Sequence, residues 1–480
     1  MTEPMRRSFL CLVAVALSNC AETPPPVNQL NLYVRPWQGR ERAETFRLAP
    51  PAAGREAELP PQSVQEALLP NGLRVLLVSR QDFPLVQVAW VVRRGAVDAP
   101  AGVATMVLQL LAAQNKGWVL QVEPEKLCLF SSVPPGLVPS VFQRGADLLL
   151  QPKFSERALT AERARLRTEE LTDLPSDPKN LMQVVGRLVY PEGHAYRLPV
   201  QGAGVLANSV RLSQLDEFAR MHITPDQTAV VAVGDITMSR LQKLTGNAFA
   251  DWKGKAIERA PPPPSIDHLP TGPAITLVDQ PMLTQSQILV AAPGTSILAS
   301  DFEALEVLNE IVAGAPTTSR VNSVLREELG YTYQAMSSLD ARRGPGLFLL
   351  IQSVAKESTV ESLRTIFSQI ERLRSENVPE EELAVSKARL RSSVLLGYDS
   401  FQATLQELTT IAAFGLPTDY TAQRLARIRA VTAKQVRAAA EKYLAADRLR
   451  TVIVGDVVAI RKPLENAGLG EVQPAIDVRR

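Results

Sequence analysis

A repeated segment constrains the fold of this chain more than any other feature of its sequence. Residues 210–235 align without a gap with residues 431–456, and both copies end in Val-Gly-Asp. In each copy a helical pattern passes through a turn, at Asp226 or Asp447, into a strand rich in β-branched residues. Two unrelated copies of a common helix-turn-strand unit are the alternative, but a gapless match at this length favours two domains of like topology.

The length and the proline pattern agree with two domains. A chain of 480 residues exceeds what one hydrophobic core usually serves. Prolines at 261–264 interrupt the chain near its middle, and such a cluster favours an extended connection. We therefore predict an α+β fold with an N-terminal domain at 62–255, a proline-rich linker at 256–273, a C-terminal domain at 274–470 and a tail at 471–480.

Hydrophobic periodicity predicts matching elements in the two halves. Alternating or continuous apolar runs predict strands at 73–79 and 86–93 in the first half, and at 275–279, 285–292 and 346–353 in the second. Apolar residues at helical spacing predict helices at 102–114, 302–313 and 360–373. Each half is expected to combine a sheet with packed helices.

Charge and cysteine content exclude some classes of function. The formal net charge is only +2, and no basic run accompanies it, so nucleic acid is not an expected partner. Of the three cysteines, Cys11 and Cys20 lie in the N-terminal segment. Cys128 is then alone in the folded body, which excludes a disulfide within that body.

The N-terminus has the organisation of an export signal. Arg6 and Arg7 precede an apolar run at 9–17, which is too short to span a bilayer as a helix. The tetrad ending at Cys20 resembles a bacterial lipobox, although Asn19 stands where a small residue is usual. We predict a lipoprotein signal peptide at 1–20, lipidation of Cys20, a proline-rich tether at 21–61 and a periplasm-facing location in the bacterial cell envelope, with the outer membrane favoured. Ordinary signal cleavage, giving a soluble periplasmic or secreted protein, is the alternative.

Three motifs together resemble a known family. Residues 69–75 read Leu-Pro-Asn-Gly-Leu-Arg-Val, residues 194–196 read His-Ala-Tyr, and residues 325–333 read Leu-Arg-Glu-Glu-Leu-Gly-Tyr-Thr-Tyr. In this combination they resemble the insulinase/pitrilysin-like (inverzincin, mitochondrial-processing-peptidase-like) metallopeptidase superfamily, over roughly residues 61–465. The resemblance implies two homologous α/β-sandwich domains that form a clamshell.

The zinc motif of that superfamily is absent from the expected helix. Active relatives carry His-x-x-Glu-His there, because residues four apart share a helix face and two imidazoles can then bind one Zn²⁺. The corresponding residues are Thr105, Leu108 and Gln109, and none is a normal zinc ligand or general base. The resemblance therefore implies a non-catalytic member without a zinc cofactor of its own.

The remaining candidate ligands do not rebuild the site. The only histidines are His194, His222 and His268, and no two have helical zinc-site spacing. Glu169 or Glu170 could be the relic of the third ligand, a glutamate on a later helix. Both are otherwise interpreted as solvated carboxylates on a charged helix.

Arg326 and Tyr333 match in spacing an arginine and a tyrosine with which the superfamily's C-terminal half faces the zinc. The resemblance implies that they bind substrate and donate hydrogen bonds to a carbonyl as it gains negative charge. Tyr331 is a competing candidate. The alternative interpretation pairs Arg326 with Glu327 or Glu328 and packs Tyr333 in the sheet.

These observations lead to three functional hypotheses. The first is an inactive subunit that pairs with an active, zinc-bearing homologue to enclose a peptide, held in an extended form by strand addition. Zinc is then expected only in the partner. The second is a membrane-anchored scaffold without a substrate. The third, an autonomous zinc peptidase, conflicts with the replaced ligands.

Overall fold

The computed structural model describes residues 64–473, apart from 115–117, 173, 175, 199, 201–208, 255–257, 260, 264–265, 267–268 and 270–273. Cys20, the predicted signal peptide and tether, His268 and most of the predicted linker lie outside the described residues.

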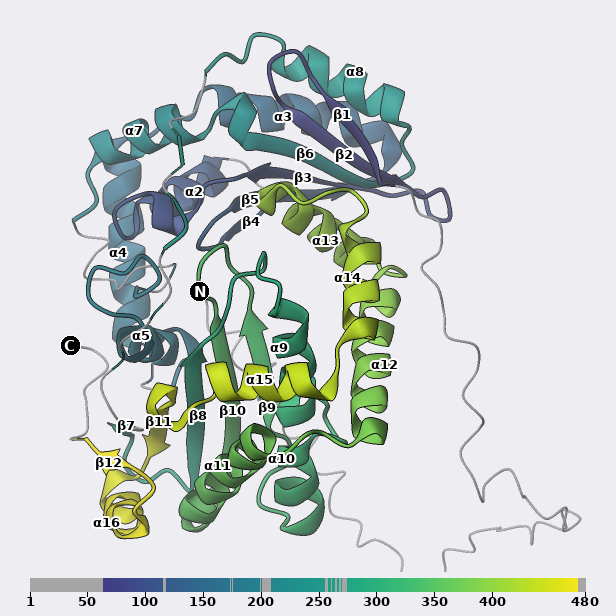
Figure 1. The fold of residues 1–480 in the computed structure, drawn as a ribbon. Coiled ribbons are helices and arrows are strands. Elements are labelled where there is room, and N and C mark those ends of the chain that lie inside the picture. Colours follow the sequence, from purple (N-terminus) through teal and green to yellow (C-terminus); the bar gives the residue numbers. More distant parts are fainter. Residues whose placement is uncertain are drawn as a thin grey trace, which may run out of the picture. The chain divides into compact units, whose positions relative to one another are not determined.

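Two six-stranded sheets form the framework of the described residues (Figure 1). The first sheet has the order β1 (Gln65–Leu68), β2 (Arg74–Ser79), β6 (Thr228–Gly234), β3 (Val86–Val92), β5 (Leu127–Val133), β4 (Val119–Val122). The second has the order β12 (Glu471–Val472), β7 (Ala274–Asp279), β11 (Arg450–Gly455), β8 (Gln285–Pro293), β10 (Leu347–Ala355), β9 (Met336–Asp340).

The repeat found in the sequence occupies the same place in both sheets. Its two copies end in β6 and β11, and each is the third strand of its sheet. β6 runs parallel to β2 and antiparallel to β3, and β11 runs parallel to β7 and antiparallel to β8. The predicted α+β class with two like halves is therefore confirmed. The segment predicted as a tail begins with β12, which pairs with β7.

Helices follow the strands in both halves. The predicted helix at 302–313 is α9 followed by a π-helical turn, Glu310–Gly314. None of the described helices is both long and apolar enough to cross a membrane. The helices are α2 (Val103–Gln114), α3 (Val138–Leu150), α4 (Glu156–Thr172), α5 (Pro178–Val189), α7 (Leu212–His222), α8 (Met238–Phe249), α9 (Phe302–Asn309), α10 (Arg320–Asn322), α11 (Thr359–Ser375), α12 (Glu380–Gly397), α13 (Phe401–Phe414), α14 (Tyr420–Ala430), α15 (Ala433–Tyr443) and α16 (Val457–Ala467).

One face of each sheet packs on helices of its own half. In the first half, apolar residues of β2, β3, β5 and β6 meet those of α2, α3, α7 and α8 in one core. Trp90 of β3 is fully buried there, with Trp118 edge-on at 4.7 Å and Phe142 at 5.3 Å between ring centroids. The second half has an equivalent core between its sheet and α9, α11, α15 and α16.

The opposite face of each sheet packs on a helix from the other half. Helix α13 covers β3 and β6 of the first sheet, and α5 covers β8 and β11 of the second (Figure 1). Sheet residues on these faces are apolar as well, so the covered strands β3, β6, β8 and β11 are buried on both sides rather than alternating between core and solvent. The two halves therefore share their buried surface, and neither has a complete core alone.

Cys128 lies on the face of the first sheet that α13 covers. It is fully buried, and burial raises the pKa of its thiol to about 12. Because the thiolate is the reactive form, we expect Cys128 to resist a thiol-specific reagent in the folded protein and to react fully after denaturation. The measurement is a thiol titration of a chain with Cys11 and Cys20 replaced by serine. Rapid labelling under native conditions would show that α13 leaves the sheet readily.

Candidate functional site

Helix α2 is the helix that carries the zinc motif in active relatives. Its corresponding residues, Thr105, Leu108 and Gln109, all contact other parts of the protein. Thr105 is buried, and its hydroxyl donates to the carbonyl of Val200 at 2.5 Å. Leu108 is 2% exposed and belongs to the core of the first half. Gln109, with its amide oriented to satisfy both atoms, donates to Glu162 at 2.8 Å and accepts from Arg165 at 3.2 Å.

This set of donors does not fit zinc. A hydroxyl bound to a carbonyl, an alkyl group and an amide offer neither imidazole nor thiolate nor carboxylate to the metal. The described residues also hold no group of three histidine, cysteine, aspartate or glutamate side chains close enough to bind an ion. Leu108 fills the place of the general base with core packing, so no water-activating chemistry can be built at this helix.

A carboxylate of α4 other than Glu169 approaches α2. Glu162 lies against Gln109, whereas Glu169 is exposed and ion-paired with Arg165, in agreement with its interpretation as a carboxylate on the charged surface of this helix. The side chain of Glu170, the other candidate relic, lies outside what the structure describes. Helical spacing explains the difference, because Glu162 and Glu169 are two turns apart along α4 and only one can meet a given position of α2.

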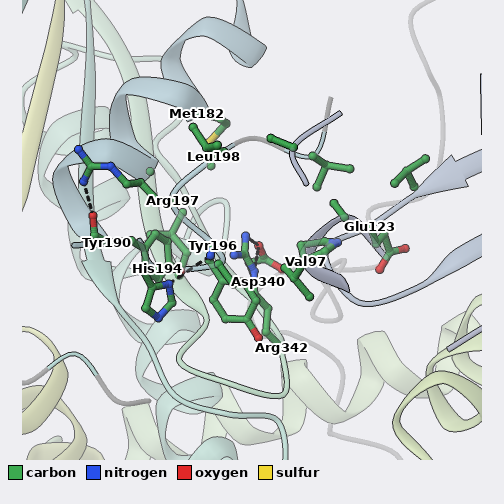
Figure 2. Close-up of a pocket in the computed structure, with 18 of the residues that line it drawn as sticks. Val97, Glu123, Met182, Tyr190, His194, Tyr196, Arg197, Leu198, Asp340 and Arg342 are labelled. Atoms are coloured by element: carbon green, nitrogen blue, oxygen red, sulfur yellow. Dashed lines mark hydrogen bonds and ion pairs between the residues drawn. The ribbon is translucent and has the colours of Figure 1, made fainter. Parts of the chain in front are cut away.

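A cavity of about 700 Å³ lies beside the N-terminus of α2 (Figure 2). Both halves contribute to it. From the first half come the segment before α2, helix α5 and the loop at 190–198, and from the second half come the ends of β9 and β10. Val200, which accepts the hydrogen bond of Thr105, also lines it. Polar and aromatic side chains in its wall include Glu123, Tyr190, His194, Tyr196, Asp340 and Arg342.

A buried carboxylate joins the two halves next to this cavity. Glu125, in the turn before β5, is 5% exposed. It accepts from the hydroxyl of Tyr196 at 2.6 Å and from the backbone N–H of Arg343 at 2.7 Å. The same tyrosine hydroxyl accepts from the backbone N–H of Gly344 at 3.0 Å. Burial and the charge of Glu125 raise the pKa of Tyr196, which therefore stays a neutral hydrogen-bond donor.

Arg342 forms the positive part of the cavity wall. Its guanidinium bonds Asp340 and lies over the rings of Tyr196 and Tyr190, at 4.5 Å and 5.7 Å from their centroids. Tyr190 stacks on His194 at 4.8 Å, and His194 Nδ1 accepts from the backbone N–H of Tyr196. The cavity thus offers aromatic faces and a fixed cation. His194 helps to hold this wall, in agreement with a structural role.

Arg326 and Tyr333 lie next to each other, and Tyr333 lines a separate groove. The guanidinium of Arg326 is 5.1 Å from the ring centroid of Tyr333 and 3.2 Å from Glu327. Tyr333 is 83% exposed, so it is not packed in the sheet as the alternative interpretation required. Tyr331 instead packs partly buried against the core of the second half. Tyr333, with its phenol free to meet a ligand, is therefore the better candidate of the two tyrosines.

The groove and the cavity lie at opposite ends of β10. Leu347 lines the cavity and Ser353 lines the groove, and six strand residues span roughly 20 Å. Both residues belong to the sheet face on which α5 packs. The structure accordingly does not bring Arg326 and Tyr333 into one cavity with Thr105 and Gln109.

The sequence analysis missed Glu125 and Arg342. Glu125 follows a proline in a short charged stretch and has the local pattern of a surface turn. Contacts with Tyr196 and with the loop of the other half, more than 200 positions away, enclose it. The segment Arg342-Arg343-Gly344-Pro345 could have marked a loop with two fixed cations, but nothing in the sequence indicates its partners.

His222, at the end of α7, is expected to make the stability of the folded protein depend on pH. Burial lowers its pKa, and the nearby cations of Arg94 and Arg259 act in the same direction while Asp98 opposes them. The unfolded chain then binds more protons at this residue than the folded chain between the lowered pKa and about 6.5. We expect its contribution to stability to be complete above that range and to be lost as the pH falls through the folded pKa.

Denaturant titrations at pH 7.5 and 5.5 test this dependence. The loss of stability at the lower pH is expected to be smaller in a His222→Gln variant, because glutamine does not titrate. An equal loss in both proteins would assign the pH effect to other groups.

Comparisons with known proteins show which families and folds this chain resembles. Residues 209–390 match the family described as Peptidase M16 inactive domain. Uncharacterised zinc proteases of Mycobacterium leprae and Mycobacterium tuberculosis are 23% and 22% identical to this chain over 286 and 285 residues, 59% of its length. The matched stretch spans 63% and 64% of those two proteins, which is less than two thirds of their length.

Solved structures match over more of the chain. A peptidase M16 inactive domain from Pseudomonas fluorescens has a TM-score of 0.71 at 20% identity, covering 82% of this chain and 98% of that one. A protease from Helicobacter pylori has the same TM-score at 17% identity, covering 82% and 100%. A chain of complex III₂ from Candida albicans reaches 0.68 at 13% identity, covering 84% and 99%.

Fold and site together define a two-domain metallopeptidase-like protein whose zinc positions hold no zinc-binding donors. The chain resembles the M16, insulinase/pitrilysin-like superfamily: residues 209–390 match its inactive domain, and the fold is shared with a solved M16 inactive domain. The resemblance seen in the sequence motifs is thereby confirmed, and the replaced residues of α2 are consistent with a non-catalytic member.

Proposed function

We propose that this chain is the non-catalytic subunit of a two-subunit peptidase. An active homologue supplies His-x-x-Glu-His and its zinc, and this chain supplies a wall of the peptide-holding chamber with Arg326 and Tyr333. The observation that carries the proposal is the state of α2. Thr105, Leu108 and Gln109 are each engaged in packing or hydrogen bonds within the protein, so this chain needs another source of catalytic groups.

The groove around Tyr333 is suited to an extended peptide. It measures about 700 Å³ and is lined by polar side chains and by the ends of β8 and β10. Amides of Gln285, Gln287 and Gln334 lie along it, and an amide can both donate to and accept from a peptide backbone. Met336 of β9 also lines it.

Strand β9 is the terminal strand of the second sheet, and among the described residues it pairs only with β10. Its outer edge therefore has backbone groups that a substrate strand can pair with. A peptide added there would run next to the groove, with Tyr333 and Arg326 close to its side chains and carbonyls.

A reconstitution assay tests the proposal. The purified chain is mixed with a candidate His-x-x-Glu-His homologue, and hydrolysis of a fluorogenic peptide is followed. The mixture is expected to exceed the active chain alone, and Arg326→Ala and Tyr333→Phe are each expected to lower the rate of the mixture about tenfold or more, because each removes a donor to the substrate.

Arg364→Ala is the matched control. Arg364 pairs with the neighbouring Glu361 on α11, as Arg326 pairs with Glu327, whereas only Arg326 lies over the ring of Tyr333, which lines the groove. If the mixture hydrolyses no more peptide than the active chain, or if the Arg326 and Tyr333 variants match the control, the proposal is wrong.

A membrane anchor is part of the proposal. The lipobox-like tetrad at Cys20 supports attachment of the subunit to the periplasmic side of the envelope. Metabolic labelling with a clickable fatty acid is expected to modify the wild-type chain and to leave a Cys20→Ser variant unlabelled. Absence of label from both would favour signal cleavage and a soluble protein.

A structural subunit without a substrate is the second candidate. The likeness to a chain of complex III₂ favours it, because that chain is part of a larger assembly. Calorimetry with unfolded polypeptide distinguishes the two, since a purely structural subunit should bind none.

A further inference from the structure

A second cavity lies between the halves, apart from the groove at Tyr333. It measures about 560 Å³, and its wall combines the end of β3, the segment before β6, the connection at 258–259, the β9–β10 loop and the end of α13. Four arginines line it: Arg93, Arg94, Arg259 and Arg343.

Two of these arginines are held by one carboxylate. Asp98 lies 3.3 Å from Arg94 and 3.2 Å from Arg259, and it also accepts from the backbone N–H of Gly95 at 2.8 Å. Arg259 donates in addition to the carbonyl of Glu125. Both oxygens of Asp98 are thus used within the protein, so Asp98 cannot also neutralise the other two cations.

The other two arginines have no such partner. Within the described part of the chain, no ion pair involves the guanidinium of Arg93 or of Arg343. Arg93 Nε donates weakly to the carbonyl of Ala413 at 3.4 Å, near the C-terminus of α13. Arg343 uses its backbone N–H, not its side chain, to bind Glu125.

The electrostatic environment agrees with an excess of positive charge. Burial lowers the pKa of Arg93, and the charges of Arg259, Arg74, Arg343 and Arg94 all act in the same direction. Burial and Arg259 likewise lower the pKa of Arg343, against the opposing charges of Glu125 and Asp98. Like charges gathered in a half-buried space are costly unless an anion offsets them.

Two further carboxylates belong to the wall and limit the site. Asp226 accepts from the hydroxyl of Thr224 at 2.7 Å, and Glu258 is exposed. These two carboxylates add negative charge to the same wall, so we expect an anion to bind near Arg93 and Arg343 rather than near Asp226 or Glu258.

We propose that this cavity binds an oxyanion, held by the guanidinium groups of Arg93 and Arg343. Guanidinium forks match carboxylate and phosphate oxygens in a planar, bidentate geometry. Because Arg93 belongs to the first half and Arg343 to the second, a bound oxyanion bridges the two halves. The inference does not depend on pairing with an active subunit. The oxyanion is either a free phosphate or the terminal carboxylate of a peptide.

Binding measurements on the full chain at fixed ionic strength test the site. The probes are inorganic phosphate, an acetylated tripeptide with a free C-terminal carboxylate and the same tripeptide as its amide. At least one of the first two is expected to bind and to raise the melting temperature, and the amide is expected to do neither. The probe that binds more tightly identifies the source of the oxyanion.

Variants locate the binding. Arg93→Gln and Arg343→Gln are each expected to lower the affinity for the probe about tenfold or more, because each removes a charge-assisted hydrogen bond. Arg343→Lys keeps the charge without the fork and should lower the affinity less. Arg144→Gln, the same change at an exposed residue of α3, should leave affinity unchanged. Circular dichroism verifies that each variant is folded. The proposal is overturned if no oxyanion binds, or if folded Arg93 and Arg343 variants bind like the control.

Discussion

Replacing Trp90 with alanine is expected to lower the free energy of unfolding by about 3–5 kcal/mol. The side chain is fully buried in the first core, where it contacts the rings of Trp118 and Phe142. Gly145 of α3 approaches it so closely that a Cβ atom there would lie 2.8 Å from the indole ring. With both sides of the ring this closely packed, truncation leaves a cavity that the surroundings cannot easily fill.

Chemical denaturation followed by circular dichroism measures this effect. Phe83→Ala is the control, because that ring is 58% exposed and its removal should change stability little. If Trp90→Ala were no more destabilising than Phe83→Ala, the core of the first half would have to relax around the missing ring.

Leu408→Ala in α13 is expected to destabilise the first half of the chain, although the residue belongs to the second. Leu408 is fully buried against the first sheet, together with Val91 and Val231. Removing a buried leucine side chain costs about 2–5 kcal/mol. Trp90, Trp118 and Trp252 belong to the first half, and the second half contains no tryptophan, so the change in tryptophan fluorescence on unfolding reports on the first half.

The midpoint of the fluorescence transition in denaturant is therefore expected to fall in Leu408→Ala. Leu373→Ala is the matched control, since Leu373 is equally buried but lies in the second half's own core. If the halves unfold in separate steps, only the Leu408 change should shift the fluorescence transition. Equal shifts in both would show that the halves unfold together, and no shift in Leu408→Ala would contradict the packing of α13 on the first sheet.

Local patterns predicted the elements well because those elements depend on local chemistry. The strands at 73–79 and 275–279 and the helix at 102–114 match β2, β7 and α2 to within a residue or two. Their apolar residues recur at strand or helix spacing, and each sits in a core formed mainly by its own half. The repeat also placed β6 and β11 in equivalent positions, since a duplicated sequence folds by the same rules twice.

The candidate site could be predicted only in part. The sequence alone indicates that Thr105, Leu108 and Gln109 cannot bind zinc, because metal coordination depends on residue type and spacing. The sequence also singled out Arg326 and Tyr333 through the family resemblance, and the structure places Arg326 near the ring of Tyr333 and beside Glu327. It did not indicate that Glu162 rather than Glu169 meets Gln109, because that contact depends on how α4 rotates against α2.

By itself, the sequence determined the class of fold, the duplication and the absence of zinc-binding donors at Thr105, Leu108 and Gln109, because these follow from periodicity and side-chain chemistry within short segments. Only the tertiary structure decided which helix covers which sheet and which charges meet. Helices α5 and α13 each pack on the sheet of the other half. The same arrangement buries Glu125 against a distant loop and gathers Arg93, Arg94, Arg259 and Arg343 around one cavity. Contacts between residues hundreds of positions apart leave no local periodicity to detect.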